Sequence, residues 1–200
     1  MKLVPATSLP DLAQVRKIYE DGFSARLRTP FEDLLTDRAL VLTDGSPRGL
    51  AVLRELGPTD WVFLRYFVVG DRGRGLGAIL WSEVRREMAE AGFTRIVYDV
   101  EDPAEEGIEE AEETVRSRRI AFYTRLGAVL LPINGYHQPN EDEPHPMLLM
   151  AADLTQAQTA PITGDDLRDT MLAVYRYRYG LADADPLVES TLRTSGLLLQ

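Results

Sequence analysis

The chain has 200 residues, of which 44% are hydrophobic and 27% are charged, so it is long enough to bury one sizeable core. Its formal net charge of -10 and pI near 4.7 argue against broad nucleic-acid binding, which relies on basic surface to neutralise phosphates. The lack of cysteine excludes disulfides, thiolate catalysis and zinc–thiolate sites. No apolar run approaches the roughly 20 residues of a membrane span, and residues 1–5 lack the apolar stretch of a secretory signal, so we expect a cytoplasmic protein without a membrane partner.

The first third of the chain predicts a strand, two helices and three further strands. Lys2 to Ala6 reads as the first strand. The run Ser8-Leu9-Pro10-Asp11 is a capping signal with proline in the first turn, so it predicts a helix through about Phe23. The same logic predicts a short second helix from Thr29-Pro30-Phe31-Glu32. Glycine and proline turns then separate three predicted strands, at residues 39–42, 49–53 and 61–69.

A glycine-rich turn joins the third of these strands to an amphipathic helix. It reads Val69-Gly70-Asp71-Arg72-Gly73-Arg74-Gly75-Leu76-Gly77-Ala78. Alternate glycines let the backbone approach a ligand closely, and the first-turn N–H groups of the following helix are unpaired donors at the positive end of its dipole. The turn therefore predicts an anion site, such as one for phosphate.

The middle of the chain predicts a strand over Arg95 to Glu101 and then a helix that ends at Gly127 as its C-cap. Residues 101–113 hold eight acidic residues and no basic one, and arginines follow them. This order suits a helix dipole, which favours a solvated helix with a charge gradient. The alternative is that the acids border an acceptor site and attract a cationic amine. Within the helix, we expect Phe122 and Leu126 to share a buried face.

The last third predicts a strand at residues 128–131 paired with one at residues 147–153, and then helices. The proline-rich loop between these strands is long enough to be functional. Asp165 opens a helix that ends at Gly180, and Asp185-Pro186 opens another through about Arg193. We expect a domain over residues 1–154 and a helical extension over residues 155–200. The aromatic run Tyr175–Tyr179 predicts packing against the domain or against a second copy of the chain.

Two strings resemble the GNAT superfamily of acyl-CoA-dependent N-acyltransferases. Arg72-x-x-Gly75-x-Gly77 is similar to the superfamily's Arg/Gln-x-x-Gly-x-Gly/Ala signature, and residues 120–128 resemble its second recurring string, Phe-Tyr-x-x-Leu-Gly-Phe/Ala. Together they cover roughly residues 61–131, with looser agreement to about residue 154. The resemblance implies an α/β fold, with a mixed, mostly antiparallel central sheet flanked by helices.

The implied activity is N-acyl transfer, most often of an acetyl group from acetyl-CoA to a small-molecule or protein amine. The residues implied to bind the cofactor are Phe67, Val68, Val69, Arg72, Gly73, Arg74, Gly75, Leu76, Gly77 and Ala78. The amide of Val69 would polarise the thioester carbonyl. Tyr123, a phenol expected near its ordinary pKa, would protonate the departing thiolate, and Asp99 or Glu101 would take the proton of the amine. Tyr136 and His137, in the long loop, are candidate substrate contacts.

Two departures from the superfamily pattern bear on these assignments. The loop from Val69 to Arg72 is about two residues shorter than in many members, which shifts the amide assignments. Arg116 stands roughly where many members carry an asparagine that contacts the cofactor, so Arg116, Arg118 or Arg119 are alternatives for a phosphate of coenzyme A.

Three other readings stay open. Gly73-x-Gly75-x-x-Ala78 also matches the dinucleotide fingerprint, with Asp99 placed to bind a ribose in an NAD-dependent oxidoreductase. The same turn suits a non-catalytic acyl-CoA-binding module. It also suits tight packing without any ligand. A metal site is not expected, because His137 and His145 are the only histidines and lie in one loop.

Overall fold

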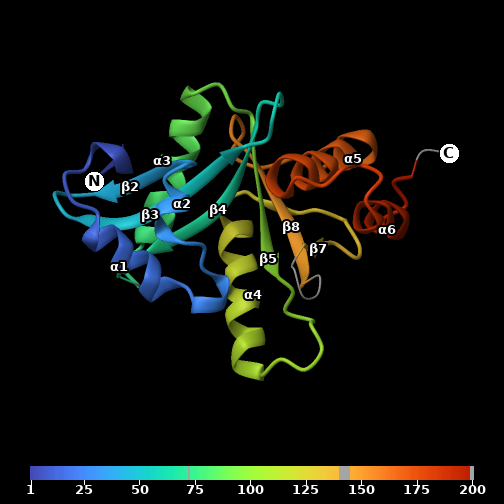
Figure 1. Cartoon of the computed structure of the whole chain (residues 1–200), viewed down its shortest axis with the longest axis horizontal. Coiled ribbons are helices and arrows are strands. Elements are labelled where there is room, and N and C mark those ends of the chain that lie inside the picture. The colour runs from blue at the N-terminus through green and yellow to red at the C-terminus, as the bar shows by residue number, and fades with distance from the viewer. Residues whose placement is uncertain (72, 140–144, 199–200) are drawn as a thin grey trace. The chain divides into compact units, whose positions relative to one another are not determined.

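The structure, a computed structural model, describes residues 1–71, 73–139 and 145–198, without the side chains of Arg26 and His145. The chain forms two compact units. Unit 1 comprises Met1–Arg54 and Leu64–Phe93, and unit 2 comprises Glu55–Phe63 and Thr94–Gln200. Hydrogen-bonded strands follow the order β1-β2-β3-β4-β5-β8-β6, and β7 pairs with β8 (Figure 1).

Unit 1 is built on antiparallel strands, as predicted. These are β1 (Lys2–Pro5), β2 (Arg38–Thr43), β3 (Pro47–Glu55) and β4 (Trp61–Val69). The last residue of β3 and the first three residues of β4 belong to unit 2. The register pairs Val4 with Val41, and Val41 with Leu50. All four elements match predicted strands, and β2 and β3 extend a few residues further because their flanking residues continue the ladder.

Three helices cover these strands: α1 (Ala13–Gly22), α2 (Phe31–Leu34) and α3 (Leu76–Glu90). On β4, Tyr66 packs against Tyr19 of α1, whereas Phe67 packs against Trp81 of α3, so successive side chains serve opposite faces. Helix α1 approaches β4 closely at Gly22, where an added Cβ would lie 2.3 Å from the Val68 side chain. Glycine is therefore required there for close packing.

The first helix begins later than its sequence signal predicts. Residues Ala6–Ser8 form a 3-10 turn, in which the Ser8 hydroxyl donates to the carbonyl of Pro5 instead of capping a helix. The Asp11 carboxylate accepts from the amide of Ala13, where α1 begins. The prediction of a helix opening at Ser8 is thus wrong by about one turn, because the serine hydroxyl serves the preceding turn.

Unit 2 contains the only parallel pairing among the strand registers of the described chain. It joins Trp61–Phe63 of β4 to Arg95–Val97 of β5 (Arg95–Glu101). Strand β5 then pairs antiparallel with β8 (His145–Asp153) over seven residues, from Arg95 with Asp153 to Glu101 with Met147. The short strands β6 (Val129–Leu130) and β7 (His137–Gln138) also pair antiparallel with β8. The sheet is mixed and mostly antiparallel, as predicted.

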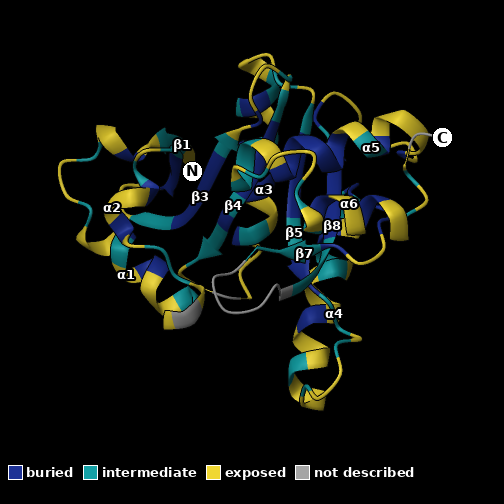
Figure 2. Ribbon diagram, turned by 45° about the vertical axis from the view of Figure 1, so that its right-hand side comes forward, coloured by how far each residue is buried: buried dark blue, intermediate teal, exposed yellow. Residues whose placement is uncertain are grey.

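Helix α4 (Glu110–Arg125) is mostly exposed, whereas β5 is mostly buried and β8 is buried at residues 149–152 (Figure 2). Phe122 and Leu126, which we expected on a buried face, are only half-buried. The fully buried aromatic of this helix is Tyr123, with 6% of its surface exposed. Gly127 has φ 92° and follows the end of the helix, as predicted for a C-cap glycine.

The helical tail belongs to the core of unit 2. It consists of α5 (Gly164–Ala173), a π-helical turn at Val174–Arg178 and α6 (Pro186–Thr194), whose first turn is capped by the Asp185 carboxylate. Buried side chains of the tail share one cluster with Phe63, Val97 and Leu149. The division between the compact units therefore does not fall near residue 154.

Side chains of the tail also bind the backbone of residues 134–137. The Ser195 hydroxyl accepts from the amide of Asn134 at 2.9 Å and lies 3.1 Å from its carbonyl oxygen. The Tyr175 hydroxyl accepts from the amide of His137 at 3.3 Å and lies 3.2 Å from its carbonyl oxygen. The Thr191 hydroxyl lies 3.1 Å from the carbonyl oxygen of Gly135. The start of the predicted long loop is thus fixed to the tail.

Candidate functional site

The glycine turn of unit 1 has the geometry of an anion site. Gly73 and Gly75 have φ of 84° and 71°, and no atom lies within 4 Å of where a Cβ would stand at either residue. Gly75 is the N-cap of α3, and no side chain caps the helix there. The amides of the first helical turn are therefore donors that a ligand can reach. Arg72, also predicted to bind the cofactor, lies outside the described residues.

The remaining cofactor candidates divide into anchors and exposed groups. Leu76, the first residue of α3, is buried, Phe67 packs on Trp81, and Val68 packs against Gly22, so these side chains hold the turn in place. The side chain of Arg74 is 77% exposed and meets Asp71 at 3.9 Å, while Ala78 is exposed. These residues therefore offer a ligand mainly their backbone, with the exposed guanidinium of Arg74 beside it.

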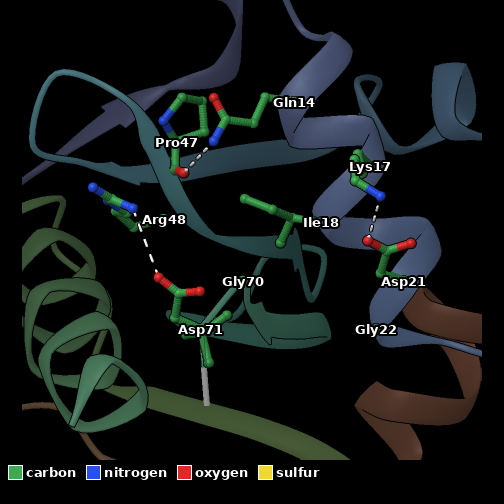
Figure 3. A pocket seen from close by; sticks show the side chains of 10 residues that line it. Gln14, Lys17, Ile18, Asp21, Gly22, Pro47, Arg48, Gly70 and Asp71 are labelled. Carbon is green, nitrogen blue, oxygen red and sulfur yellow. Dashed lines mark hydrogen bonds and ion pairs between the residues drawn. The ribbon is translucent and has the colours of Figure 1, made fainter. Parts of the chain in front are cut away.

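A cavity of about 270 Å³ lies beside the turn and entirely within unit 1 (Figure 3). It is formed by α1, by the start of β3 and by the end of β4 with the two residues after it. Lys17 and Asp21 of α1 are bonded to each other at 2.9 Å, and Arg48 faces Asp71 at 3.7 Å. Ile18 lies between these two charged pairs (Figure 3). The cavity was not predictable from the sequence, because no motif links α1 to the start of β3 and the end of β4.

The predicted catalytic residues all lie in unit 2. Tyr123 packs against Tyr98 of β5 in a tilted arrangement, with ring centroids 4.5 Å apart. Burial raises the pKa of Tyr123 above its ordinary value, and the nearby charge of Arg119 only partly opposes this. The expectation of an unperturbed phenol is therefore corrected. Tyr123 is a fully protonated phenol at neutral pH, which is the state that a proton donor to a thiolate needs.

Asp99 is held by two tyrosine hydroxyls. Tyr179, just after the π-helical turn, donates to its carboxylate at 2.5 Å, and Tyr136 donates at 3.4 Å. Burial raises the pKa of Asp99, while these hydrogen bonds and the charge of Arg178 partly offset the effect. A carboxylate with a raised pKa is a stronger base than an ordinary one. Neither tyrosine partner was predicted, although the odd aromatic run at residues 175–179 was the signal for one of them.

Glu101 is bound by α4. Arg119 donates to its carboxylate at 2.6 Å, and Arg116 lies 3.7 Å away. In a regular strand, Val97, Asp99 and Glu101 would share a face, because side chains alternate between the two faces of a sheet. Val97 and Asp99 do contact the tail, but Glu101 at the end of the strand turns to the arginines of α4 instead.

Arg116 cannot serve as the predicted phosphate contact in this structure. Its side chain is 5% exposed and is paired with Glu101, Glu105 and Glu112, and it donates to the carbonyl of Asp102. Three acids of the segment therefore bind this arginine, whereas four others are exposed, as expected for a solvated segment: Glu106, Glu109, Glu110 and Glu113. Arg118 is exposed and Arg119 binds Glu101.

Of the two candidate substrate contacts, only Tyr136 is in the core. Tyr136 is 1% exposed and packs on Tyr175 with ring centroids 5.3 Å apart. His137 is half-buried, and its ring Nδ1 lies 2.8 Å from the carbonyl oxygen of Gly135. A substrate contact by Tyr136 or His137 stays a prediction.

Within residues 1–71, 73–139 and 145–198, no three histidine, aspartate or glutamate side chains gather as a metal site would require. None of the helices described there is both long and apolar enough to cross a membrane.

No protein-family model and no curated protein matches the chain. Solved structures do match. A protein from Bacteroides thetaiotaomicron, assigned to the GNAT family of acetyltransferases, is 21% identical, with a TM-score of 0.67 over 91% of this chain and 100% of its own. The ribosomal-protein-alanine N-acetyltransferase of Brucella melitensis is 17% identical, with a TM-score of 0.56 over 76% and 99% of the two chains. The chain has the GNAT fold.

A third similar structure, a GNAT acetyltransferase from Elizabethkingia anophelis, was solved with acetyl-CoA bound. It is 12% identical, with a TM-score of 0.54 over 76% of this chain and 97% of its own. The GNAT fold also corrects the dinucleotide reading. A doubly wound domain has a mostly parallel sheet, whereas the described registers here hold one parallel pair, β4 with β5.

Proposed function

We propose that the protein is an acyl-CoA-dependent N-acyltransferase that moves an acetyl group from acetyl-CoA to a primary amine. The observation that carries this is the turn before α3, where two glycines with positive φ and open space above them precede an uncapped helix. Such a turn suits the pyrophosphate of coenzyme A, and the GNAT fold of the chain supports an acyl-CoA ligand.

In this proposal each step has a group that suits it. The pyrophosphate binds the amides of residues 73–78, with Arg74 adding a charge-assisted contact. The Val69 amide polarises the thioester carbonyl. Asp99 removes the proton of the attacking amine, in preference to Glu101, because its pKa is raised while Glu101 is paired with two arginines. Tyr123 protonates the thiolate of coenzyme A.

The test is binding of acetyl-CoA, CoA and NAD to the purified protein by calorimetry, comparing wild type with Gly75→Glu. The new carboxylate would occupy the open space above the turn and repel the pyrophosphate. We expect wild type to bind acetyl-CoA and CoA, and Gly75→Glu to lose at least about tenfold in affinity.

Gly92→Glu is the matched control, because Gly92 lies just past the other end of α3, has φ 92° and also has no atom near its Cβ position. It imposes the same backbone strain and charge away from the turn. Equal loss of acetyl-CoA binding in both variants, or binding of NAD alone, would contradict the proposal.

A non-catalytic acyl-CoA-binding module is the second candidate. This candidate is favoured because every predicted catalytic side chain already has a structural role. Tyr123 is buried, and the carboxylates of Asp99 and Glu101 accept hydrogen bonds within the protein. The two candidates differ in turnover. Release of thiol from acetyl-CoA with an amine panel, lost in Tyr123→Phe, supports the enzyme, whereas binding without turnover of any amine supports the module.

A further inference from the structure

The cavity beside the glycine turn carries charges of both signs around an apolar centre. Arg48 and Lys17 are its cations, Asp71 and Asp21 are its carboxylates, and Ile18 lies between the two pairs (Figure 3). A ligand that is only anionic would meet both carboxylates, and one that is only cationic would meet both cations. The lining therefore suits a molecule that carries both charges itself.

The two charged pairs differ in the distance between their charged atoms. Lys17 donates to Asp21 at 2.9 Å, one turn along α1, so each satisfies the other. Arg48 and Asp71 are 3.7 Å apart, which exceeds hydrogen-bond distance. Arg48 is fixed by bonds from its Nε to Asp44 at 3.0 and 3.1 Å, and Asp71 has Arg74 at 3.9 Å as its other cation. A ligand can thus bind Arg48 and Asp71 without breaking a hydrogen bond between them.

We propose that this cavity is the acceptor site for an uncharged α-amino acid, whose carboxylate binds Arg48 and whose ammonium binds Asp71. The two charges of such a molecule sit on one carbon, which matches a cation and a carboxylate that face each other. Its side chain then lies against Ile18. A cavity of 270 Å³ has the volume of roughly nine waters, which suits a molecule the size of leucine.

This assignment rests on the proposed function, because it identifies the amine of that reaction. Val69, whose amide is proposed to polarise the thioester, lines the same cavity. The amine nitrogen attacks the carbonyl carbon and the bond from that carbon to sulfur breaks. Of the three protons of the ammonium, one stays on the amide, one leaves with CoA as the thiol and one passes to a base and then to water.

The experiment compares L-leucine with L-leucinamide, which lacks the carboxylate, and with 4-methylpentanoate, which lacks the amine. Binding is measured by calorimetry without acetyl-CoA, and acetylation is measured by thiol release with it. We expect leucine to bind and to be acetylated, leucinamide to be acetylated with a KM about tenfold higher, and 4-methylpentanoate to bind more weakly than leucine.

Substitutions of Arg48 and Asp71 test which residue binds the carboxylate of the ligand and which binds its ammonium group. Arg48→Gln should raise the KM for leucine about tenfold and leave that for leucinamide unchanged, while Arg48→Lys restores part of the loss. Asp71→Asn should raise the KM for both amines. Arg86→Gln is the matched control, since Arg86 lies on the outer face of α3, paired with Glu83 and Glu90, and should change neither.

The outcomes separate the two proposals. If acetyl-CoA binds but leucine neither binds nor is acetylated, or if Arg48→Gln affects leucine and leucinamide equally, the acceptor assignment is wrong and the acyltransferase proposal stands. If leucine binds in an Arg48-dependent way but acetyl-CoA does not bind, the cavity is an amino-acid site and the acyltransferase proposal fails.

Discussion

Asp99 is the residue whose surroundings depart furthest from what its position on β5 suggests. A carboxylate at the end of a strand would ordinarily face water, yet this one lies beneath the tail and accepts from Tyr136 and Tyr179. Since burial raises its pKa, the folded protein binds its proton more tightly than the unfolded chain does. The carboxylate therefore makes folding pH-dependent.

The sign of this effect is testable with Asp99→Asn, which cannot ionise. The stability that wild type gains from the bound proton is complete below the ordinary aspartate pKa of about 4 and is lost as the pH rises toward the raised value. We expect the free energy of unfolding of wild type, minus that of Asp99→Asn, to fall as the pH increases from 4 to 7. Urea unfolding at several pH values measures it, and a difference that stays flat or rises would refute the assignment.

Sequence reasoning placed Asp99, Glu101 and Tyr123 on the correct elements but could not give their partners. Tyr179 is 80 residues from Asp99 and Arg119 is 18 residues from Glu101, and no local pattern encodes such pairings. The glycine turn was predictable for the opposite reason. A positive φ and an uncapped helix start follow from the local sequence alone.

At the scale of elements, one arginine fastens the segment between β5 and α4. Arg116 pairs with Glu101 at the end of β5, with Glu105 in the segment and with Glu112 on its own helix. The acid-rich composition predicted a charge gradient along a helix, and a helix does begin at Glu110 with acids in its first turn. The composition did not reveal that three of these acids converge on a single buried cation.

Replacing Arg116 with an uncharged residue should destabilise the fold. Arg116→Gln removes the buried cation that Glu101, Glu105 and Glu112 share, and only Arg119 on Glu101 offsets the loss, so we expect it to lower the free energy of unfolding by about 3 kcal/mol at pH 7. The loss should shrink near pH 4, where the carboxylates take up protons.

Arg118→Gln on the same helix is the control for that measurement. Its side chain is exposed, so we expect a change within about 0.5 kcal/mol. Chemical denaturation of both variants at two pH values gives the comparison. Similar losses in the two would mean that Arg116 contributes no more than a surface charge.

At the scale of the whole molecule, the order of strands and helices was predicted almost completely, because each has its own hydrophobic pattern and turn residues. The role of the tail was not. Its helices have apolar faces, and the sequence alone does not tell whether these faces pack against each other in a separate extension, against another subunit or against the core of unit 2. The structure places Met171, Tyr175 and Val188 in one cluster with strand residues of unit 2, and Arg95 of β5 makes a bidentate pair with Asp166 of α5.

The tail is accordingly expected to be indispensable for folding. A chain that ends at Leu154 would expose the buried cluster and lose the side chains that bind residues 134–137. We expect it to show no cooperative thermal transition, or to aggregate, whereas a chain that ends at Leu197 should unfold like the full-length protein. Circular dichroism melts of both proteins provide the test. A stable, cooperative fold for residues 1–154 would show that the tail is a separate extension after all.

The π-helical turn at Val174–Arg178 makes the tail sensitive to the length of the chain as well as to its composition. It precedes Tyr179, the donor to Asp99, and follows a helix anchored by Asp166 on Arg95. A π-helical turn already holds about one residue more than an α-helical turn, so one further residue here would swing Tyr179 about a quarter-turn away from its carboxylate. Point substitutions leave this phasing intact, but a single-codon insertion does not. Gene variants one codon longer in this turn should therefore be much rarer than variants with a changed residue.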